Sequence, residues 1–368
     1  METRYNSADV IAELRGPIGF LTLNRPKALN ALSLDMVRAL TAHLLAWRDD
    51  PAVLAVAVRG MGREGPFGAF CAGGDIRFFH QAALGGDPAL EDFFTEEYRL
   101  NYLIATYPKP YIAFMDGIVM GGGMGISQGA SLRVVTERTK MAMPETGIGL
   151  FPDVGGSYFL SRCPGRVGEY LALTGLTIGS AEAVAWGLAD GHIDSAQLPV
   201  LWDTLAGTPF ESSHAIEHWV RTRFAAQPKK PATAAIDAAF AASDVPAIGA
   251  ALAAGASEWA HATLALLDKR SPLMLAVVLE QIRRGRARGL GDCLRMERTL
   301  VRRCFDTVHL GRRGAASETV EGIRALAIDK DHQPRWNPAQ IDAVTPDMVA
   351  GFFTSAWPAY AHPLYDLV

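Results

Sequence analysis

Two acidic residues in an otherwise apolar, glycine-rich stretch are the first candidates for chemistry. Glu145 and Asp153 stand eight residues apart, and large apolar side chains lie between them. Burial next to apolar side chains raises the pKa of a carboxylic acid, which favours acid–base or nucleophilic work. A purely structural interpretation remains open for both. Asp153 fits the cap of a helix that begins at Val154, and Glu145 fits a first-turn or surface acid.

Two glycine turns offer a different kind of chemistry, through backbone amides. Gly73-Gly74 and Gly121-Gly122-Gly123 each follow a strand-like run, and the second turn precedes a predicted helix. Amides at a helix start have no partner within the helix and carry the positive end of its dipole. One N–H from each turn would make an oxyanion hole, in which losing a donor costs ~10²–10³ in rate. Alternatively, the glycines only permit tight turns or close packing.

Other catalytic motifs fit these turns less well. Neither turn carries a nucleotide-phosphate motif. The run GISQG at residues 125–129 matches the nucleophile elbow of serine hydrolases, which needs its serine on a turn directly after a strand. Here three glycines already make the turn, and Ser127 falls about one turn into the predicted helix. We therefore interpret Ser127 as a helix residue.

Strand-like and helix-like segments alternate in the part of the chain that carries these residues. Ser33 precedes an amphipathic helical pattern, and each glycine turn lies between a strand and a helix. This alternation predicts an α/β fold with helices packed on sheets. The predicted strands are residues 10–14, 18–24, 53–58, 111–114, 118–119, 132–136 and 141–143.

The character of the chain changes after about residue 198. The residues that follow are rich in Ala, Leu, Glu and Arg, and strand signals are few. Ser271-Pro272 has the form of a helix start, with proline at the first helical position. We predict a catalytic core over residues 1–198 and a mainly helical C-terminal region over residues 199–368, packed on the core and without catalysis of its own.

Composition excludes several classes of protein. The 368 residues carry a formal charge of −4, 49% are apolar and 20% are charged, so neither nucleic acid nor a membrane surface is indicated as the partner. None of the four cysteines forms a C-x-x-C pair, so we expect free thiols and no metal site. Residues 1–9 lack an apolar signal core and no apolar run reaches membrane-spanning length, so we expect a cytoplasmic protein.

Several motifs, in order along the chain, resemble a known family over about residues 10–355. NRPKALNAL at 24–32, CAGGDI at 71–76, Lys109-Pro110 and the glycines at 121–123 resemble the crotonase (enoyl-CoA hydratase/isomerase) superfamily. MPE at 143–145, FPDVGG at 151–156, EGIRA at 321–325, IDKD at 328–331 and WNP at 336–338 resemble its 3-hydroxyisobutyryl-CoA hydrolase branch.

The resemblance implies a crotonase-like spiral of ββα turns with an α-helical C-terminal extension. It implies that the amides of Gly74 and Gly122 hold the thioester oxygen of an acyl-CoA substrate. Glu145 would be the main catalytic carboxylate, and Asp153 would contact the 3-hydroxyl or carboxyl end of the substrate and assist. The residues that the resemblance places along the substrate are Glu97, Lys27, Ala28, Leu29, Ala72, Gly73, Asp75, Ile76 and Gly121.

The chain departs from the hydratases of the superfamily at two positions. Gly125 stands where they carry a glutamate, and Asp153 stands where they often carry glycine. The site thus keeps thioester activation and lacks the carboxylate pair that hydrates a double bond. We expect hydrolysis of 3-hydroxyisobutyryl-CoA to 3-hydroxyisobutyrate and CoA, a step of valine degradation.

Several points stay open at this stage. Glu145 acts either as a nucleophile that forms a mixed anhydride or as a general base on water. The acyl group can also be 3-hydroxypropionyl, because one methyl group is worth only about 1–3 kcal/mol of discrimination. No metal or redox cofactor is needed for either route, and a homo-oligomer is possible because the superfamily tends to form trimers. A hydratase or isomerase, a serine hydrolase and a non-catalytic acyl-CoA-binding protein remain as rivals.

Overall fold

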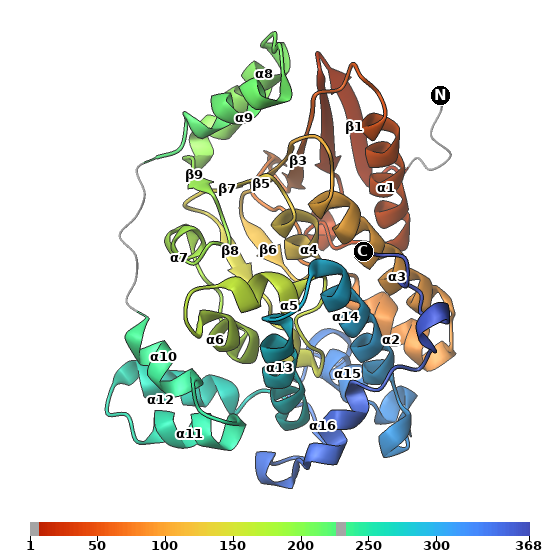
Figure 1. Ribbon diagram of the computed structural model, residues 1–368, viewed down its shortest axis with the longest axis vertical. Helices are drawn as coiled ribbons and strands as arrows, with labels where there is room; N and C mark the ends of the chain where they lie inside the picture. Colours follow the sequence, from red (N-terminus) through yellow and green to blue (C-terminus); the bar gives the residue numbers. More distant parts are fainter. Residues whose placement is uncertain (1–6, 226–232) are drawn as a thin grey trace. The chain divides into compact units, whose positions relative to one another are not determined.

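A computed structural model describes residues 7–225 and 233–368. The chain forms two compact units that alternate along the sequence (Figure 1). Unit 1 takes the described residues of Met1–Gly74, Arg99–Ala142 and Thr177–Pro231. Unit 2 takes the described residues of Asp75–Tyr98, Met143–Leu176 and Ala232–Val368.

Unit 1 is built on a mixed sheet with the strand order β1-β2-β3-β5-β7-β9. The first two strands are antiparallel and the following neighbours in this order are parallel, while the short β4 pairs with β3. The strands are β1 (Val10–Arg15), β2 (Ile18–Leu23), β3 (Ala55–Gly62), β4 (Gly65–Pro66), β5 (Tyr111–Met115), β7 (Leu132–Val135) and β9 (Gly191–His192). All six residues of β2 are buried, as expected for a strand covered on both faces.

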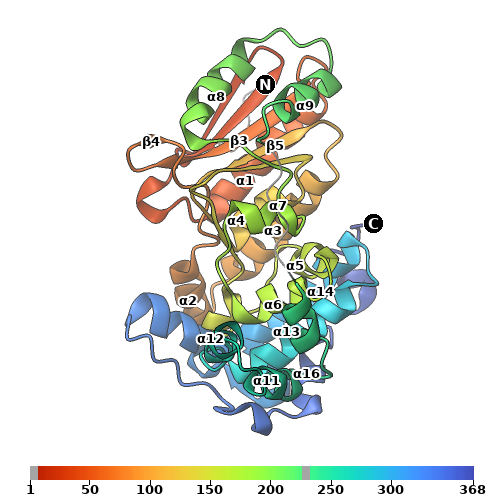
Figure 2. The same ribbon diagram turned by 90° about the vertical axis from the view of Figure 1, so that its left-hand side faces the viewer.

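Two helices close one face of this sheet, as Figure 2 shows for α8 (Leu198–Gly207) and α9 (Ser213–Arg221). Trp202 of α8 is buried against aromatic side chains of the sheet region, with ring centroids 4.7 Å from Phe20 and 5.6 Å from Phe114. These helices therefore belong with the sheet, although they follow the boundary predicted at residue 198. The boundary at residue 198 stays a prediction. Each of the two compact units is made of three separate segments of the chain.

Short elements outside the large sheet flank the second glycine turn of unit 1. Strands β6 (Ile118–Met120) and β8 (Lys140–Ala142) form a separate parallel pair. Helix α4 (Gly122–Gln128) follows β6 in the chain. Helix α1 (Leu34–Arg48) begins after Ser33, as the sequence predicted, and the Ser33 hydroxyl accepts the Met36 N–H. The remaining described elements of unit 1 are η1 (Pro26–Ala28), α7 (Ser180–Ala185) and η4 (Ser195–Gln197).

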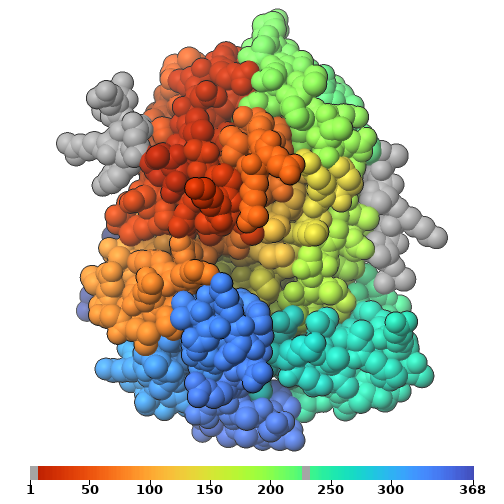
Figure 3. All heavy atoms as spheres, turned by 180° about the vertical axis from the view of Figure 1, so that it is seen from behind, coloured from red at the N-terminus to blue at the C-terminus, as the bar shows by residue number. Residues whose placement is uncertain are grey.

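Unit 2 is almost entirely helical. In Figure 3 its blue C-terminal segments lie beside the orange segment that contains α2, which packs on α15. Helix α3 belongs to unit 2 as far as Tyr98. The helices are α2 (Ile76–Gly85), α3 (Ala89–Ala105), α5 (Gly156–Phe159), α6 (Val167–Thr174), α10 (Ala234–Phe240), α11 (Val245–Ala253), α12 (Glu258–Leu267), α13 (Pro272–Gly285), α14 (Leu290–Phe305), α15 (Glu318–Ile323) and α16 (Pro346–Phe352). The shorter elements are η2 (Glu145–Ile148), η3 (Leu160–Arg162), β10 (Asp306–Thr307), η5 (Val308–Leu310), β11 (Arg312–Arg313), η6 (Gly314–Ala316), η7 (Arg324–Ile328), η8 (Ile341–Ala343) and η9 (Ala359–Ala361).

The α/β class and the helical C-terminal part that the sequence predicted are both confirmed. Helix α13 starts after Ser271, whose hydroxyl accepts the Met274 N–H, and Pro272 is its first residue. All four cysteines are buried, and none of them forms a disulfide bond. Among the described residues, no helix combines the length and apolar character that crossing a bilayer requires.

Candidate active site

The two glycine turns of unit 1 lie next to each other. Cys71 joins them, because its N–H donates to Ile118 O at 2.9 Å and its carbonyl accepts from Met120 N at 3.0 Å. Gly73 adopts φ +109°, and a Cβ there would stand only 3.6 Å from the Gly122 nitrogen. The positive φ is what favours glycine at residue 73, and the distance shows that this residue lies in contact range of the amide that the resemblance places in the oxyanion hole.

The second turn shows that different glycines serve different purposes. Gly121 caps α4 with φ 48° and ψ −120°, a conformation that few residues other than glycine adopt. The N–H groups of Met124 and Gly125 donate to Gly121 O in the first hydrogen bonds of the helix. The Gly122 N–H comes before these bonds in the chain, where helix amides have no partner within the helix. A Cβ on Gly123 would lie 2.3 Å from Cys71 O, so close packing, the alternative explanation, does hold for this glycine.

The residues predicted to line a CoA channel divide between the units. In unit 1, Lys27 and Ala28 belong to the turn η1, and Leu29 follows at φ 52° with its carbonyl accepting from Ala72 N at 3.0 Å. The structure therefore places Lys27, Ala28 and Leu29 close to Ala72 within unit 1. Asp75 and Ile76 belong to unit 2, where Asp75 caps α2 by accepting from Phe78 N at 3.3 Å.

Three carboxylates gather inside unit 2. Glu97 of α3, Glu145 of η2 and Asp153 are 2%, 6% and 5% exposed. The Tyr98 hydroxyl donates to Asp153 Oδ2 at 2.8 Å. Asp153 does not cap a helix with its side chain, because α5 begins later and Gly155 stands at its N-cap. Glu145 does lie in a first turn, but it is buried, so it is not a surface acid.

These carboxylates change one another's acidity. Burial, followed by the charges of Asp153 and Glu145, raises the pKa of Glu97 well above its ordinary value. Burial and the charge of Asp153 likewise raise the pKa of Glu145. Burial raises the pKa of Asp153 to about 7, against the Tyr98 hydrogen bond, which favours the charged form. All three therefore hold protons more strongly than free carboxylic acids do.

Two oxygens of this cluster are buried without a hydrogen-bond partner among the described residues. They are Glu97 Oε1 and Glu145 Oε2. Leaving a buried polar atom unpaired costs about 1–3 kcal/mol, so each such atom calls for an explanation. In this cluster the two oxygens are candidates to accept or donate a hydrogen bond when a polar group of a ligand is present.

Helices of the C-terminal region hold the turn that carries Glu145. The Leu150 N–H donates to Glu145 O at 3.0 Å, and Ser271, the cap of α13, donates its N–H to Thr146 O at 3.2 Å. The Thr319 hydroxyl of α15 donates to Gly149 O at 2.6 Å. A carboxylate from one part of the chain is thus oriented by residues more than a hundred positions later.

Sequence reasoning missed three polar residues around Asp153. Tyr98 contacts its carboxylate, and Glu297 and Gln281 hydrogen-bond the turn around it. Tyr98 stands beside Glu97 in the sequence and shares its helix, which is a usable signal. Glu297 and Gln281 stand in amphipathic helical patterns, and nothing in their spacing connects them to residue 153.

The serine-hydrolase alternative is not supported by the position of Ser127. This residue is buried within α4, and its hydroxyl donates to Gly123 O at 2.8 Å, the carbonyl one turn earlier. A side chain committed to its own helix is not presented on a strand-to-helix turn as the nucleophile elbow requires. Gly125 belongs to the same helix, so no carboxylate projects from this position.

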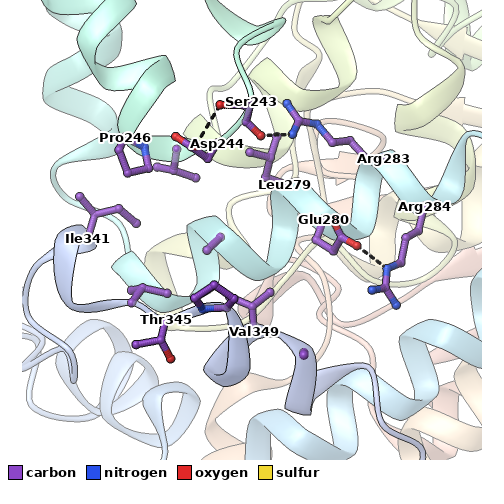
Figure 4. A pocket seen from close by; sticks show the side chains of 15 residues that line it. Ser243, Asp244, Pro246, Leu279, Glu280, Arg283, Arg284, Ile341, Thr345 and Val349 are labelled. Atoms are coloured by element: carbon purple, nitrogen blue, oxygen red, sulfur yellow. Dashed lines mark hydrogen bonds and ion pairs between the residues drawn. The ribbon is translucent and has the colours of Figure 1, made fainter.

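Two other groupings of polar residues lie apart from the predicted site. In unit 1, Glu137, His192 and Asp194 could each offer a metal-ligand atom within 4.8 Å of the others, but Glu137 already accepts from Ser195 N at 2.9 Å. In unit 2, a pocket of about 490 Å³ lies among α11, α13 and α16 (Figure 4). Arg284 pairs with Glu280 there, and no residue of the predicted site lines the pocket.

Comparison with known proteins gives the family. Residues 18–353 match the family model described as enoyl-CoA hydratase/isomerase. The chain is 40% identical over 348 residues to the 3-hydroxyisobutyryl-CoA hydrolase, mitochondrial, of Xenopus tropicalis, covering 92% of this chain and 87% of that one. It is 39% identical to 3-hydroxyisobutyryl-CoA hydrolase 1 of Arabidopsis thaliana, covering 95% and 92%.

Two solved structures share the fold over nearly the whole chain. A carnitinyl-CoA dehydratase from Mycobacterium thermoresistibile matches with a TM-score of 0.86 and 36% identity, covering 98% of this chain and 99% of that one. An enoyl-CoA hydratase from Rhodobacter sphaeroides matches with a TM-score of 0.83 and 36% identity, covering 95% and 98%. These names differ in reaction but agree in acyl-CoA chemistry, and with the matched model they establish that the chain belongs to the enoyl-CoA hydratase/isomerase family.

Proposed function

We propose that this protein hydrolyses an acyl-CoA thioester, with 3-hydroxyisobutyryl-CoA as the substrate and 3-hydroxyisobutyrate and CoA as the products. The observation that carries the proposal is the buried cluster of Glu97, Glu145 and Asp153, in which two carboxylate oxygens have no hydrogen-bond partner in the described part of the chain. Relatives at 38–40% identity that bear the hydrolase name support the choice of reaction and acyl group.

The backbone turns of unit 1 would activate the thioester. In the proposed reaction its carbonyl oxygen accepts hydrogen bonds from the amides of Gly74 and Gly122, which stabilise the negative charge of the tetrahedral intermediate. The closeness of the two turns supports this assignment, because a Cβ built on Gly73 would lie 3.6 Å from the Gly122 nitrogen. Residues 27–29, together with Ala72, Gly73, Asp75, Ile76 and Gly121, would line the path of CoA.

Glu145 would carry the chemical step. Its ionised carboxylate either attacks the thioester carbon to give a mixed anhydride, which water then cleaves, or removes a proton from an attacking water molecule. In both routes the thiolate of CoA leaves and takes up a proton. Trapping with hydroxylamine separates the routes, because only an anhydride leaves a hydroxamate on Glu145.

Asp153 and Glu97 would recognise the polar end of the acyl group. A 3-hydroxyl group can donate to the charged Asp153 and accept from a protonated Glu97. Sites built to pair a substrate hydroxyl reject analogues that lack it strongly, by ~10⁴–10⁵-fold in the best cases. The proposal therefore expects isobutyryl-CoA to be a far poorer substrate than its 3-hydroxy derivative, whereas 3-hydroxypropionyl-CoA should be a moderate one.

The main alternative is a hydratase or isomerase acting on a related short acyl-CoA, as the names of the similar structures suggest. Hydration uses two carboxylates around the attacking water, and the place of one of them is taken by Gly125 in α4. Rapid conversion of crotonyl-CoA, without release of free CoA, would favour this alternative.

The decisive experiment measures CoA release with a thiol reagent across a panel of short acyl-CoA esters. We expect the 3-hydroxyisobutyryl ester to react fastest and Glu145→Gln to lose at least ~10³-fold in kcat, because the reacting group is removed. Glu169→Gln is the matched control, since Glu169 is equally buried but pairs with Arg166 and Arg286. Full activity of Glu145→Gln would refute the assignment.

Three further points belong to this proposal. The reaction needs no metal or redox cofactor. A cytoplasmic location is part of the proposal, whereas the vertebrate relatives are named mitochondrial. A homo-oligomer is compatible with the proposal, and light scattering of the purified chain would establish its state.

A further inference from the structure

We infer that Glu297, together with Gln281, is a positioning residue that fixes Asp153 by clamping the turn on either side of it. Both side chains come from the late helices α14 and α13 and are fully buried. Neither is expected to touch the substrate. The part of the inference that concerns rate rests on the proposed function, whereas the part that concerns order in the turn does not.

Glu297 binds the chain directly after Asp153. Its Oε2 accepts from Gly155 N at 2.7 Å, and its Oε1 accepts from Ser157 N at 2.8 Å and from the Ser157 hydroxyl. Three hydrogen bonds thus converge on one buried carboxyl group. One carboxylate therefore ties two alternate residues of a single turn to helix α14.

Gln281 binds the chain directly before Asp153. Its amide Nε2 donates to Pro152 O at 2.6 Å and to the Ser157 hydroxyl oxygen at 2.9 Å. Ser157 thus accepts from Gln281 and donates to Glu297, which links the two helices through one hydroxyl group. Asp153 lies between Pro152 and Gly155, whose backbone groups are both held by these hydrogen bonds, so the backbone of Asp153 has little freedom to move.

The backbone between the attachment points is strained, which explains why a clamp is needed. Val154 has φ 54°, a left-handed conformation that is unfavourable for a β-branched residue. Such a backbone conformation persists only where the surrounding structure determines it. The hydrogen bonds to Glu297 and Gln281 supply that constraint, and Tyr98 completes it by holding the carboxylate itself.

The carboxylate is kept at this position despite the cost of burial. Burial raises the pKa of Glu297 to about 8, while its bonds to Ser157 and Gly155 oppose this change. A glutamine would retain one acceptor oxygen but would turn an NH2 group toward one of the two backbone N–H groups. The Glu297→Gln variant therefore opens one end of the clamp without changing the size of the side chain.

Kinetics of this variant test the effect on rate. We expect kcat for the 3-hydroxyacyl-CoA ester to fall ~10–100-fold with KM changed less than about threefold, since a displacement near 1 Å can cost ~10²-fold in the chemical step. Glu169→Gln serves again as the control, because it also removes a buried carboxylate from unit 2. If both variants lose stability but keep kcat, Glu297 is only structural.

A double variant tests whether Glu297 acts through Asp153. If it does, Asp153→Asn/Glu297→Gln has the same kcat as Asp153→Asn alone, because the second change has no remaining target. If the two losses multiply instead, Glu297 affects the reaction by another route and the inference is wrong.

Hydrogen exchange tests the effect on order without any substrate. Mass spectrometry of peptides covering residues 152–159 should show exchange at least ~10-fold faster in Glu297→Gln than in wild type and in Glu169→Gln. Unchanged exchange would overturn the inference even in an active enzyme. Faster exchange in a protein that hydrolyses no acyl-CoA would support the clamp and refute the proposed function, so the two failures are distinguishable.

Discussion

The two regions that carry the candidate chemistry work on opposite principles. In unit 1 the proposed active groups are backbone amides, and what matters at Gly73 and Gly123 is the absence of a side chain. In unit 2 the proposed active groups are carboxylates, and what matters is how Glu97, Glu145 and Asp153 are buried together. The first region depends on short-range backbone geometry, the second on helices that arrive more than a hundred residues later.

This difference indicates which amino-acid substitutions each region tolerates. The glycine turns should withstand changes of charge nearby but no added Cβ. Conservative substitutions in the carboxylate cluster should leave the fold of the protein intact. They should change the pKa values of the remaining carboxylic acids and the rate of the reaction markedly. Substitutions in the first region should therefore act mainly on stability, and those in the second mainly on pH dependence and turnover.

Gly123→Ala should be the most damaging single change in the glycine turns. Its Cβ would meet Cys71 O at 2.3 Å, a backbone atom that cannot move aside. We expect a loss of roughly 3 kcal/mol or more in the free energy of unfolding, measured by urea denaturation. Gly207→Ala is the control, because open space surrounds that glycine. Equal stability of the two variants would show that the turns are not tightly packed.

Asp153→Asn should change how stability depends on pH. The pKa of Asp153 is raised from 3.8 to about 7, so between these values the folded protein binds more protons than the unfolded chain. The contribution of Asp153 to the free energy of unfolding therefore falls as pH rises through this window, by at most ~1.4 kcal/mol for each pH unit. The variant should lack this contribution and show a shallower decline than the wild type between pH 5 and pH 8, measured by denaturation, while the raised pKa values of Glu97, Glu145 and Glu297 still cause part of the decline.

Asp244→Asn supplies a control that should leave the slope between pH 5 and pH 8 unchanged. The hydrogen bond from Ala247 N lowers the pKa of this exposed helix cap. Its stabilising effect is present above the ordinary aspartate range and is lost as pH falls through the lowered pKa. The same slope between pH 5 and pH 8 in wild type and in Asp153→Asn would contradict the buried-cluster interpretation.

Tyr98→Phe should raise the apparent pKa seen in the pH–rate profile. The Tyr98 hydroxyl favours the charged form of Asp153, so its removal should raise the pKa of Asp153 above the wild-type value of about 7. Tyr111→Phe is the matched control, since that buried hydroxyl has no hydrogen-bond partner among the described residues. A profile that moves equally in both variants would remove Tyr98 from the site.

Ser127→Ala should have the smallest effect. The hydroxyl bonds only to carbonyls of its own helix, so we expect CoA release within about twofold of wild type and a stability change within about 1 kcal/mol. Labelling of Ser127 by a fluorophosphonate, with loss of activity in the variant, would restore the serine-hydrolase alternative.

How far each region could be predicted from the sequence depends on whether its structure is set by neighbouring residues or by distant ones. The strands, the glycine turns and the helix starts at Ser33 and Ser271 could be predicted because their signals are local. The grouping of α8 and α9 with the sheet could not, because their helical pattern does not say which surface Trp202 covers. The helix-cap alternative for Asp153 failed for a similar reason, since the actual partner is Tyr98.

The sequence by itself determined the family, the α/β class, the candidate carboxylates and the glycines beside them, because motif spacing and backbone preference are properties of neighbouring residues. Tertiary structure alone decided that Glu97, Glu145 and Asp153 share one buried cluster, and that Tyr98, Gln281 and Glu297 hold it. Burial and the mutual repulsion of charges depend on which distant segments pack together, and those two effects set the acidity on which the proposed chemistry depends.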